Sequence, residues 1–169
     1  MKIGNLTRLG LLSAIALTIF MVEAQIPALV PVPGVKLGLA NIVTVFAVWV
    51  LGPWEGAAVL AVRIFLGAVF SGNFGTIFYS AAGGLLAILT TIGLRRILKN
   101  NQLWVAGCLG AVAHSIGQMI VAVLLTGTPG LVIYLPVLIL CGIITGLFTG
   151  LCAQVLVDRG KDFWKTTFR

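Results

Sequence analysis

The sequence predicts an all-α integral membrane protein, a bundle of six transmembrane helices with both termini cytoplasmic. The first observation behind this prediction is composition: 60% of the 169 residues are hydrophobic, 9% are charged, and the mean hydropathy is +1.15. Soluble domains carry about 25% charged residues. A core of this size could not hide so much apolar surface from water, so we expect lipid to be the solvent around the chain.

The second observation is the spacing of the apolar runs, which indicates one transmembrane domain and a cytoplasmic tail at 158–169. The first run could also imitate a signal peptide, but it is long and Val22-Glu23-Ala24 is a poor cleavage site. Two runs are short for a layer of about 30 Å, so we expect tilted or partly irregular helices there, as around transport sites. The expected spans are residues 6–28, 37–51, 54–70, 76–94, 103–125 and 131–157, of which the second and third are the short ones.

The third observation is the distribution of the basic residues. With six spans, the side that holds both termini collects all of them except Lys36, on the other side, and Arg63, inside a span. By the positive-inside rule this side is cytoplasmic, and we expect a multi-pass protein of the cell (plasma) membrane. The net charge of +7 is then topogenic, and no nucleic acid partner is expected. The basic residues of the cytoplasmic side are Lys2, Arg8, Arg95, Arg96, Lys99, Arg159, Lys161, Lys165 and Arg169.

Residues 31–41, with the sequence PVPGVKLGLAN, form the one long break in the apolar N-terminal half. Two prolines and a glycine exclude regular helix there. We interpret the segment as an ordered, non-helical cap between the first two spans, lying over a ligand site. Lys36 and Asn41 would reach the site from this cap, although a lysine in a loop is often only solvated.

Two charged residues lie inside the spans. Glu23 lies in the outer part of the first span, and Arg63 lies about two turns from the outer end of the third. A charge buried in a membrane is costly unless it is paired or faces a cavity. The two side chains therefore either form a structural bridge that fixes helix packing or bind an ionic group of a ligand.

Further polar residues fall in the same half of the bundle. His114 and Gln118 are four residues apart and share a helix face, as ligand contacts or as an interhelical hydrogen-bonding pair. Asn73 and Tyr79 flank the second outer loop, where Tyr79 could instead be an interfacial anchor, and Tyr134 has the same ambiguity. The inner half has almost no polar side chains apart from Gln154.

This asymmetry predicts a binding site open to the outside rather than an ion path, which should line both halves. Two cations, one anion and a titratable histidine favour a small zwitterionic or anionic organic ligand, and the apolar walls also suit a quinone or isoprenoid precursor. The candidate ligand-binding residues are Glu23, Lys36, Asn41, Arg63, Asn73, Tyr79, His114 and Gln118.

Catalysis and metal binding find little support in the sequence. There is no aspartate-rich DDxxD motif for Mg²⁺, no GxxxxGK[ST], no HExxH and no GxSxG. Asp158 and Asp162 belong to the charged tail. The three cysteines lie in apolar runs without CxxC spacing, and we interpret them as small packing residues in the membrane. We therefore expect a protein that is not an enzyme, with no metal site, no catalytic residue and no bound cofactor.

Small residues repeat at four-residue intervals in the first span, at Gly10, Ala14 and Thr18. Such a face lets another helix approach closely. The partner could be another protein or a helix of the same bundle.

Several motifs together resemble a known family. Residues 32–41 (VPGVKLGLAN), Arg63 to Gly67 (RIFLG), Gly83-Gly84 and His114 to Gln118 (HSIGQ) look like the Gx transporter family, which also carries the label heptaprenyl diphosphate synthase component I. Together with the six spans and the small-residue face, they resemble the substrate-binding (S) components of energy-coupling-factor (ECF) transporters. The resemblance covers nearly the whole chain to about Val157.

The resemblance implies a partner as well as a fold. S components capture a micronutrient or cofactor precursor and dock on a transmembrane T component that carries two ATPases, so ATP would be used only by partners. In that family an AxxxA face on the first span meets the T component; here Gly10 replaces its first alanine and Ala14 matches the second. The alternative, from the family label, is a non-catalytic membrane accessory subunit of a prenyl (heptaprenyl) diphosphate synthase, and a solitary channel or flippase is a third.

Overall fold

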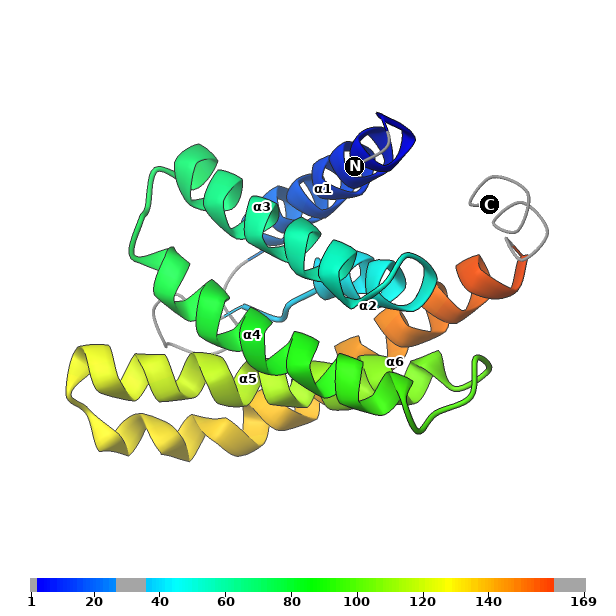
Figure 1. Ribbon diagram of the computed structural model, residues 1–169. Helices are drawn as coiled ribbons and strands as arrows, with labels where there is room; N and C mark the ends of the chain where they lie inside the picture. Colours follow the sequence, from blue (N-terminus) through cyan, green and yellow to red (C-terminus); the bar gives the residue numbers. More distant parts are fainter. Residues whose placement is uncertain (1–2, 27–35, 160–169) are drawn as a thin grey trace.

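The computed structural model describes residues 3–26 and 36–159, and within them the regular secondary structure is all helical, with no strand (Figure 1). The all-α prediction is therefore confirmed for the described residues. A 3₁₀ helix, Pro129–Tyr134, precedes the last α-helix. The α-helices are α1 (Ile3–Glu23), α2 (Asn41–Val50), α3 (Pro53–Ser71), α4 (Thr76–Arg95), α5 (Leu103–Thr126) and α6 (Leu135–Arg159).

Five of these helices are long and apolar enough to cross a membrane, which indicates a multi-pass membrane protein. The exception is α2, with 10 residues. At a rise of about 1.5 Å per residue it spans about 15 Å, half of a typical hydrocarbon layer. The expected span at 37–51 is thus a half-length helix, and the prediction of six full spans holds for five helices.

Proline and glycine set the helix boundaries near this short element. Pro53 occupies the first turn of α3, where its missing N–H costs nothing, directly after Gly52 with φ of 140°. Gly72 ends α3 and Gly127 ends α5, both in the left-handed conformation that glycine adopts without strain. These ends lie within one residue of the expected spans 54–70 and 103–125.

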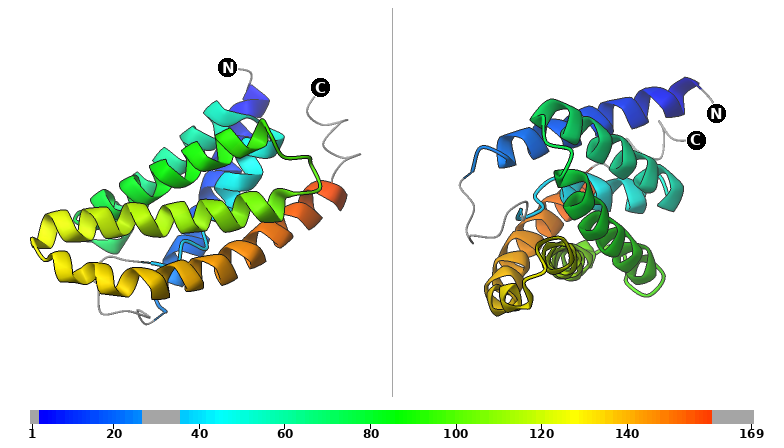
Figure 2. Two further views of the ribbon diagram at one scale, coloured as in Figure 1. Left: turned by 90° about the horizontal axis from the view of Figure 1, so that it is seen from below. Right: turned by 90° about the vertical axis from the view of Figure 1, so that its left-hand side faces the viewer.

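The helices form two groups with α2 between them. In Figures 1 and 2, α1 and α3 lie together on one side, while α4, α5 and α6 lie together on the other. Helix α5 packs against both α4 and α6, and α2 contacts each of the other five α-helices. Almost all of α2 is buried, so this short helix forms the centre of the fold.

Glycines allow a close approach between α5 and α6. A Cβ placed on Gly107 would lie 2.6 Å from the carbonyl oxygen of Gly146, and a Cβ on Gly146 would lie 2.6 Å from that of Gly107. Neither position has room for a side chain. Small residues at a helix interface permit this backbone contact, as is common in membrane bundles.

The two ends of the bundle differ. We call "terminal end" the end at which α1 begins, α6 ends and the α4–α5 loop lies; the α3–α4 loop and the α5–α6 turn lie at the opposite end (Figures 1 and 2). At the terminal end, Gln154 accepts a hydrogen bond from the Leu103 N–H (2.8 Å) and donates to the Asn100 carbonyl (2.7 Å) and the Asp158 carboxylate (2.8 Å). Trp49 donates to the Asn100 side chain (3.1 Å). This network, called the Gln154 network below, ties α2, α5 and α6 together.

A buried polar cluster in the middle of the bundle

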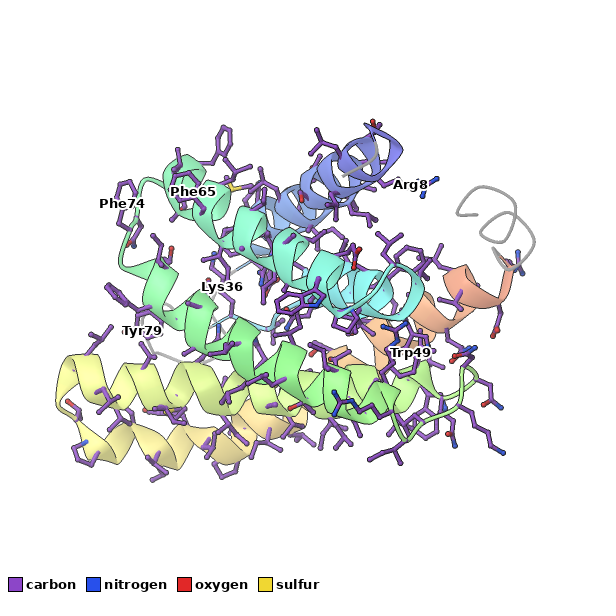
Figure 3. The ribbon with its side chains drawn as sticks, viewed as in Figure 1. Arg8, Lys36, Trp49, Phe65, Phe74 and Tyr79 are labelled. Atoms are coloured by element: carbon purple, nitrogen blue, oxygen red, sulfur yellow. The ribbon has the colours of Figure 1, made fainter. Side chains whose placement is uncertain are left out.

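The described part of the predicted cap, residues 36–40, lies inside the molecule rather than at its rim. Gly38 is buried, and a Cβ placed on it would lie 3.0 Å from Cδ2 of His114 and 3.0 Å from Nδ2 of Asn41. Because His114 lies midway along α5, this segment reaches the middle of the bundle, where α2 begins. Figure 3 shows Lys36 in the middle of the molecule, between α3 and α4 in that view. Residues 36–40 are non-helical, as predicted for the cap, but they lie deeper than a cap at the outer side of the bundle. Residues 27–35 lie outside the described part.

Two side chains from different helices hold this segment in place. Glu23, at the end of α1, accepts a hydrogen bond from the backbone N–H of Gly38 at 2.6 Å. Gln118, on α5, accepts one from the backbone N–H of Lys36 at 3.2 Å. One oxygen of each side chain is therefore used to position residues 36–38.

One aromatic ring lies close to both cations of the cluster. Nζ of Lys36 lies 3.9 Å from the centre of the Phe20 ring, and Cζ of Arg63 lies 5.8 Å from it. Both distances lie within the range of cation–π attraction. The ring fits against α3 because position 67 is glycine: a Cβ there would lie 2.7 Å from Cε1 of Phe20. Phe20 thus stabilises two positive charges that lie close to the same ring.

Arg63 is the most costly member of the cluster. Its side chain is 2% exposed, and its Nε and Nη2 atoms have no hydrogen-bond partner within the part of the chain that the structure describes. A structural salt bridge between Glu23 and Arg63 was one of the two expectations from the sequence. Nε and Nη2 of Arg63 do not donate to the Glu23 carboxylate. Buried arginine is expected to be paired or hydrogen-bonded, so a partner for this guanidinium edge is missing.

Asn41 and His114 complete the cluster. Neither the Oδ1 nor the Nδ2 atom of Asn41 has a hydrogen-bond partner among residues 3–26 and 36–159, and the side chain is 7% exposed. The His114 ring is 2% exposed and fits between two glycines, because a Cβ on Gly83 would lie 2.8 Å from its Cε1 and Nδ1. Gly38 closes the other side of the ring. The glycines therefore fix where the imidazole lies.

Lys36 belongs to the loop before α2, outside the membrane-crossing helices. Its partial burial lowers the pKa of its ammonium group below the usual value; the nearby Glu23 carboxylate raises this pKa and the Arg63 charge lowers it. The net direction is downward, because desolvation is the largest effect. The three charges are thus close enough to act on one another.

Buried polar side chains also extend from Asn41 toward the terminal end. A cavity of about 10 Å³, enough for about one water molecule, is lined by Asn41, Thr44, Thr91 and Thr149, together with small apolar residues. The hydroxyl oxygen of Thr44 has no partner in the described residues. The expectation that this half has almost no polar side chains apart from Gln154 is therefore corrected, because buried threonines lie there as well.

Two candidate residues lie apart from the cluster. Asn73 is exposed in the α3–α4 loop, where its side chain accepts a hydrogen bond from the Gly75 N–H at 3.0 Å. Tyr79 is 8% exposed and packs with Met119, Ala122 and Leu138. Of the eight candidates, the structure brings together Glu23, Lys36, Asn41, Arg63, His114 and Gln118.

Phe20 was missed by the sequence reasoning. It precedes Glu23 by three residues, so both share a face of α1, and this spacing is the signal that could have found it. The threonines of the cavity carry no such signal, because threonine is ordinary in a membrane helix. Among the described residues there is no group of three His, Cys, Asp or Glu side chains that could hold a metal ion.

The small-residue face of α1 is directed away from the bundle. Gly10, Ala14 and Thr18 are all exposed, and a Cβ on Gly10 would meet no atom within 4 Å. The hydroxyl of Thr18 donates to the Ala14 carbonyl at 2.9 Å. These three residues therefore do not serve packing among the described helices.

Comparison with known proteins gives one family. A family model described as heptaprenyl diphosphate synthase component I matches residues 12–156, most of the chain. The chain therefore belongs to that family. No curated protein and no solved structure shows a significant match.

Proposed function

We propose that this member of the heptaprenyl diphosphate synthase component I family is the substrate-binding (S) subunit of an ECF-type importer. It would capture a small micronutrient or cofactor precursor from outside the cell and dock on a T component with two ATPases. The chain itself would have no enzymatic activity and no bound cofactor. The ligand site would be the cluster around Arg63, Asn41 and His114.

The observation that supports this proposal best is the set of unpartnered polar atoms at the start of α2. Nε and Nη2 of Arg63 and both polar atoms of Asn41 are buried without a partner in the described residues. Each buried polar group of this kind costs about 1–3 kcal/mol, and more when it is charged. A binding site explains this cost, because a ligand supplies the missing partners.

The short helix α2 supports the same proposal. Helices that begin at mid-depth, after non-helical backbone, are typical of transporter binding sites. Irregular backbone at such depth is tolerated where protein or a water-filled cavity satisfies it. Here Glu23 and Gln118 accept the backbone N–H groups of Gly38 and Lys36.

The orientation in the membrane is part of the proposal. Arg8, at the start of α1, lies at the terminal end in Figure 3. The α4–α5 turn and the end of α6 add four more basic residues to this end: Arg95, Arg96, Lys99 and Arg159. The positive-inside rule then assigns the terminal end to the cytoplasm of the cell membrane.

The exposed face of α1 is the proposed docking surface for the T component. Gly10, Ala14 and Thr18 would let a partner helix approach closely. The double variant Gly10→Leu/Ala14→Leu fills this face without touching the central cluster. We expect it to lose the T component while it keeps its thermal stability. Leu140→Phe, at an exposed position of α6 away from this face, is the matched control.

Affinity purification of the full chain from its native membranes tests the proposal. A T component and paired ATPases recovered with the wild type, and lost with the double variant, would support it. Recovery of a soluble prenyltransferase instead would favour the second candidate, a non-catalytic accessory subunit of a prenyl diphosphate synthase. The family description favours that candidate. Flux in liposomes that contain this chain alone would contradict both.

A further inference from the structure

We propose that the central site takes a ligand with an anionic group of at least two oxygens, a carboxylate or a phosphate, on the Nε–Nη2 edge of Arg63. This inference rests on the proposed function, since it names the ligand class of the same site. It depends on three features: which atoms of Arg63 are free, the balance of charge around them, and the direction of α2.

The free atoms of Arg63 form one recognition edge. Nε and the outer Nη2 lie on the same side of the planar guanidinium, so their N–H groups point in parallel. Such an edge binds two oxygens of a carboxylate or phosphate at once. Both atoms are buried and without a partner in the described chain. Water could accept these hydrogen bonds, but it would not neutralise the charge.

The charge balance around this edge favours an anion. Arg63 and Lys36 supply two positive charges beside Phe20, and Glu23 supplies one negative charge. One Glu23 oxygen is already occupied by the Gly38 N–H. A neutral ligand would leave one positive charge uncompensated in a buried place, and a cationic ligand would add another. An anion balances the cluster.

The start of α2 adds a favourable dipole. Asn41 is the first residue of this helix, and its Nδ2 donor has no partner in the described residues. The N-terminus of a helix carries a partial positive charge that stabilises anions within the first turn. Nδ2 of Asn41 can therefore donate to an anion, and the positive end of the helix dipole adds to the charge of Arg63 and Lys36.

Thermal unfolding of the purified full chain with matched four-carbon probes tests the inference. The probes are butyrate, butyl phosphate, butyramide and butylammonium, which contain four carbon atoms each and differ in the head group. We expect butyrate or butyl phosphate to raise the Tm, because a ligand that binds only the folded state stabilises it. Butyramide and butylammonium should leave it unchanged. Comparison of the two anions tells a carboxylate site from a phosphate site.

Arg63→Met keeps the length of the side chain and removes the charge, and Arg159→Met, at an exposed position, is the control. We expect Arg63→Met to weaken anion binding by about 30-fold or more, since the anion loses a buried, charged, bidentate partner. Arg159→Met should bind as the wild type does. Equal shifts with neutral or cationic probes, equal anion binding by Arg63→Met, or no shift with either anion would each overturn the inference.

The ligand class and the importer role can fail separately. Purification with a T component but no anion response would leave the proposed function intact and exclude this ligand class. An anion response without a T component would support the ligand class and contradict the importer role. Loss of folding in Arg63→Met is covered by Arg63→Lys, which keeps the charge without the bidentate edge and should weaken binding in a folded protein.

Discussion

Two polar regions in one bundle show opposite states of hydrogen bonding. In the Gln154 network at the terminal end, the side-chain oxygen and nitrogen of Gln154 both have partners at 2.7–2.8 Å. In the central cluster, both polar atoms of Asn41 and two nitrogens of Arg63 have none among the described residues. Both regions are largely buried, so burial alone does not separate them.

Under the proposed function, this difference separates polar residues that serve the fold from those that would bind a ligand. A satisfied network holds elements together, and its residues gain nothing from a further partner. An unsatisfied cluster costs stability in the free protein and is retained for another reason. Stability and binding should therefore respond in opposite ways to changes in the two regions.

The largest loss of stability is expected from Gln154→Leu. The change leaves the Leu103 N–H and the Asn100 carbonyl without their partner, and each such buried group costs about 1–3 kcal/mol. Thermal unfolding in detergent should show a clear fall in Tm, while the folded fraction binds the anionic probe unchanged. Asn101→Ala, exposed in the same loop, is the control. A Gln154→Leu protein as stable as the wild type would remove the distinction between the regions.

Gly83→Ala tests the central cluster by crowding His114. The new Cβ would lie 2.8 Å from Cε1 and Nδ1 of the ring, and overpacking of this kind costs about 1–3 kcal/mol. The ring can move only at the expense of Gly38 and Asn41, so we expect probe binding to fall about tenfold or more.

The control for this change is Gly93→Ala, on the same helix, where a Cβ meets nothing within 4 Å. It should be neutral or slightly stabilising, since alanine favours helix. Isothermal titration with the anionic probe and thermal unfolding of both variants supply the comparison. Equal behaviour of the two alanine variants would contradict the position of His114.

Arg63→Met is expected to change stability in the opposite direction from Gln154→Leu. In the free protein the guanidinium edge is buried without a partner, so its removal relieves a desolvation cost. Removing one member of a buried ion pair is usually destabilising, but here Glu23 keeps Lys36 as a counter-charge and the Gly38 N–H as a hydrogen-bond donor. Unfolding without any probe should show a Tm equal to or above that of the wild type. A marked fall would assign Arg63 a structural role.

The sequence predicted the helical class and most of the central residues, and its failures have physical causes. Hydrophobic runs and proline–glycine breaks located the helices, because membrane helices must be apolar along their length. Residues 36–40 were placed at the rim because depth depends on tertiary packing, here on the room that Gly38 and Gly83 leave for His114. Asn73 was grouped with the site because its loop was expected nearby, whereas its side chain closes its own turn.

The smallest effect concerns pH and Lys36. Burial lowers the pKa of its ammonium group, so the positive charge is present below this pKa and is lost as the pH rises through it, earlier than for an ordinary lysine. Affinity for an anion should then be highest at neutral pH and fall by about two- to fivefold toward alkaline pH, as for a partly exposed ion pair. Butyrate is the suitable probe, because its own carboxylate stays ionised over this range.

The matched variant is Lys36→Arg, whose guanidinium stays charged throughout. In this variant the affinity should no longer depend on alkaline pH, while Arg63 continues to hold the anion. Titrations of butyrate at a series of pH values, for wild type and variant, measure the difference. An identical fall in both proteins would mean that the charge lost belongs to another group, and Lys36 would then contribute only its contact with Phe20.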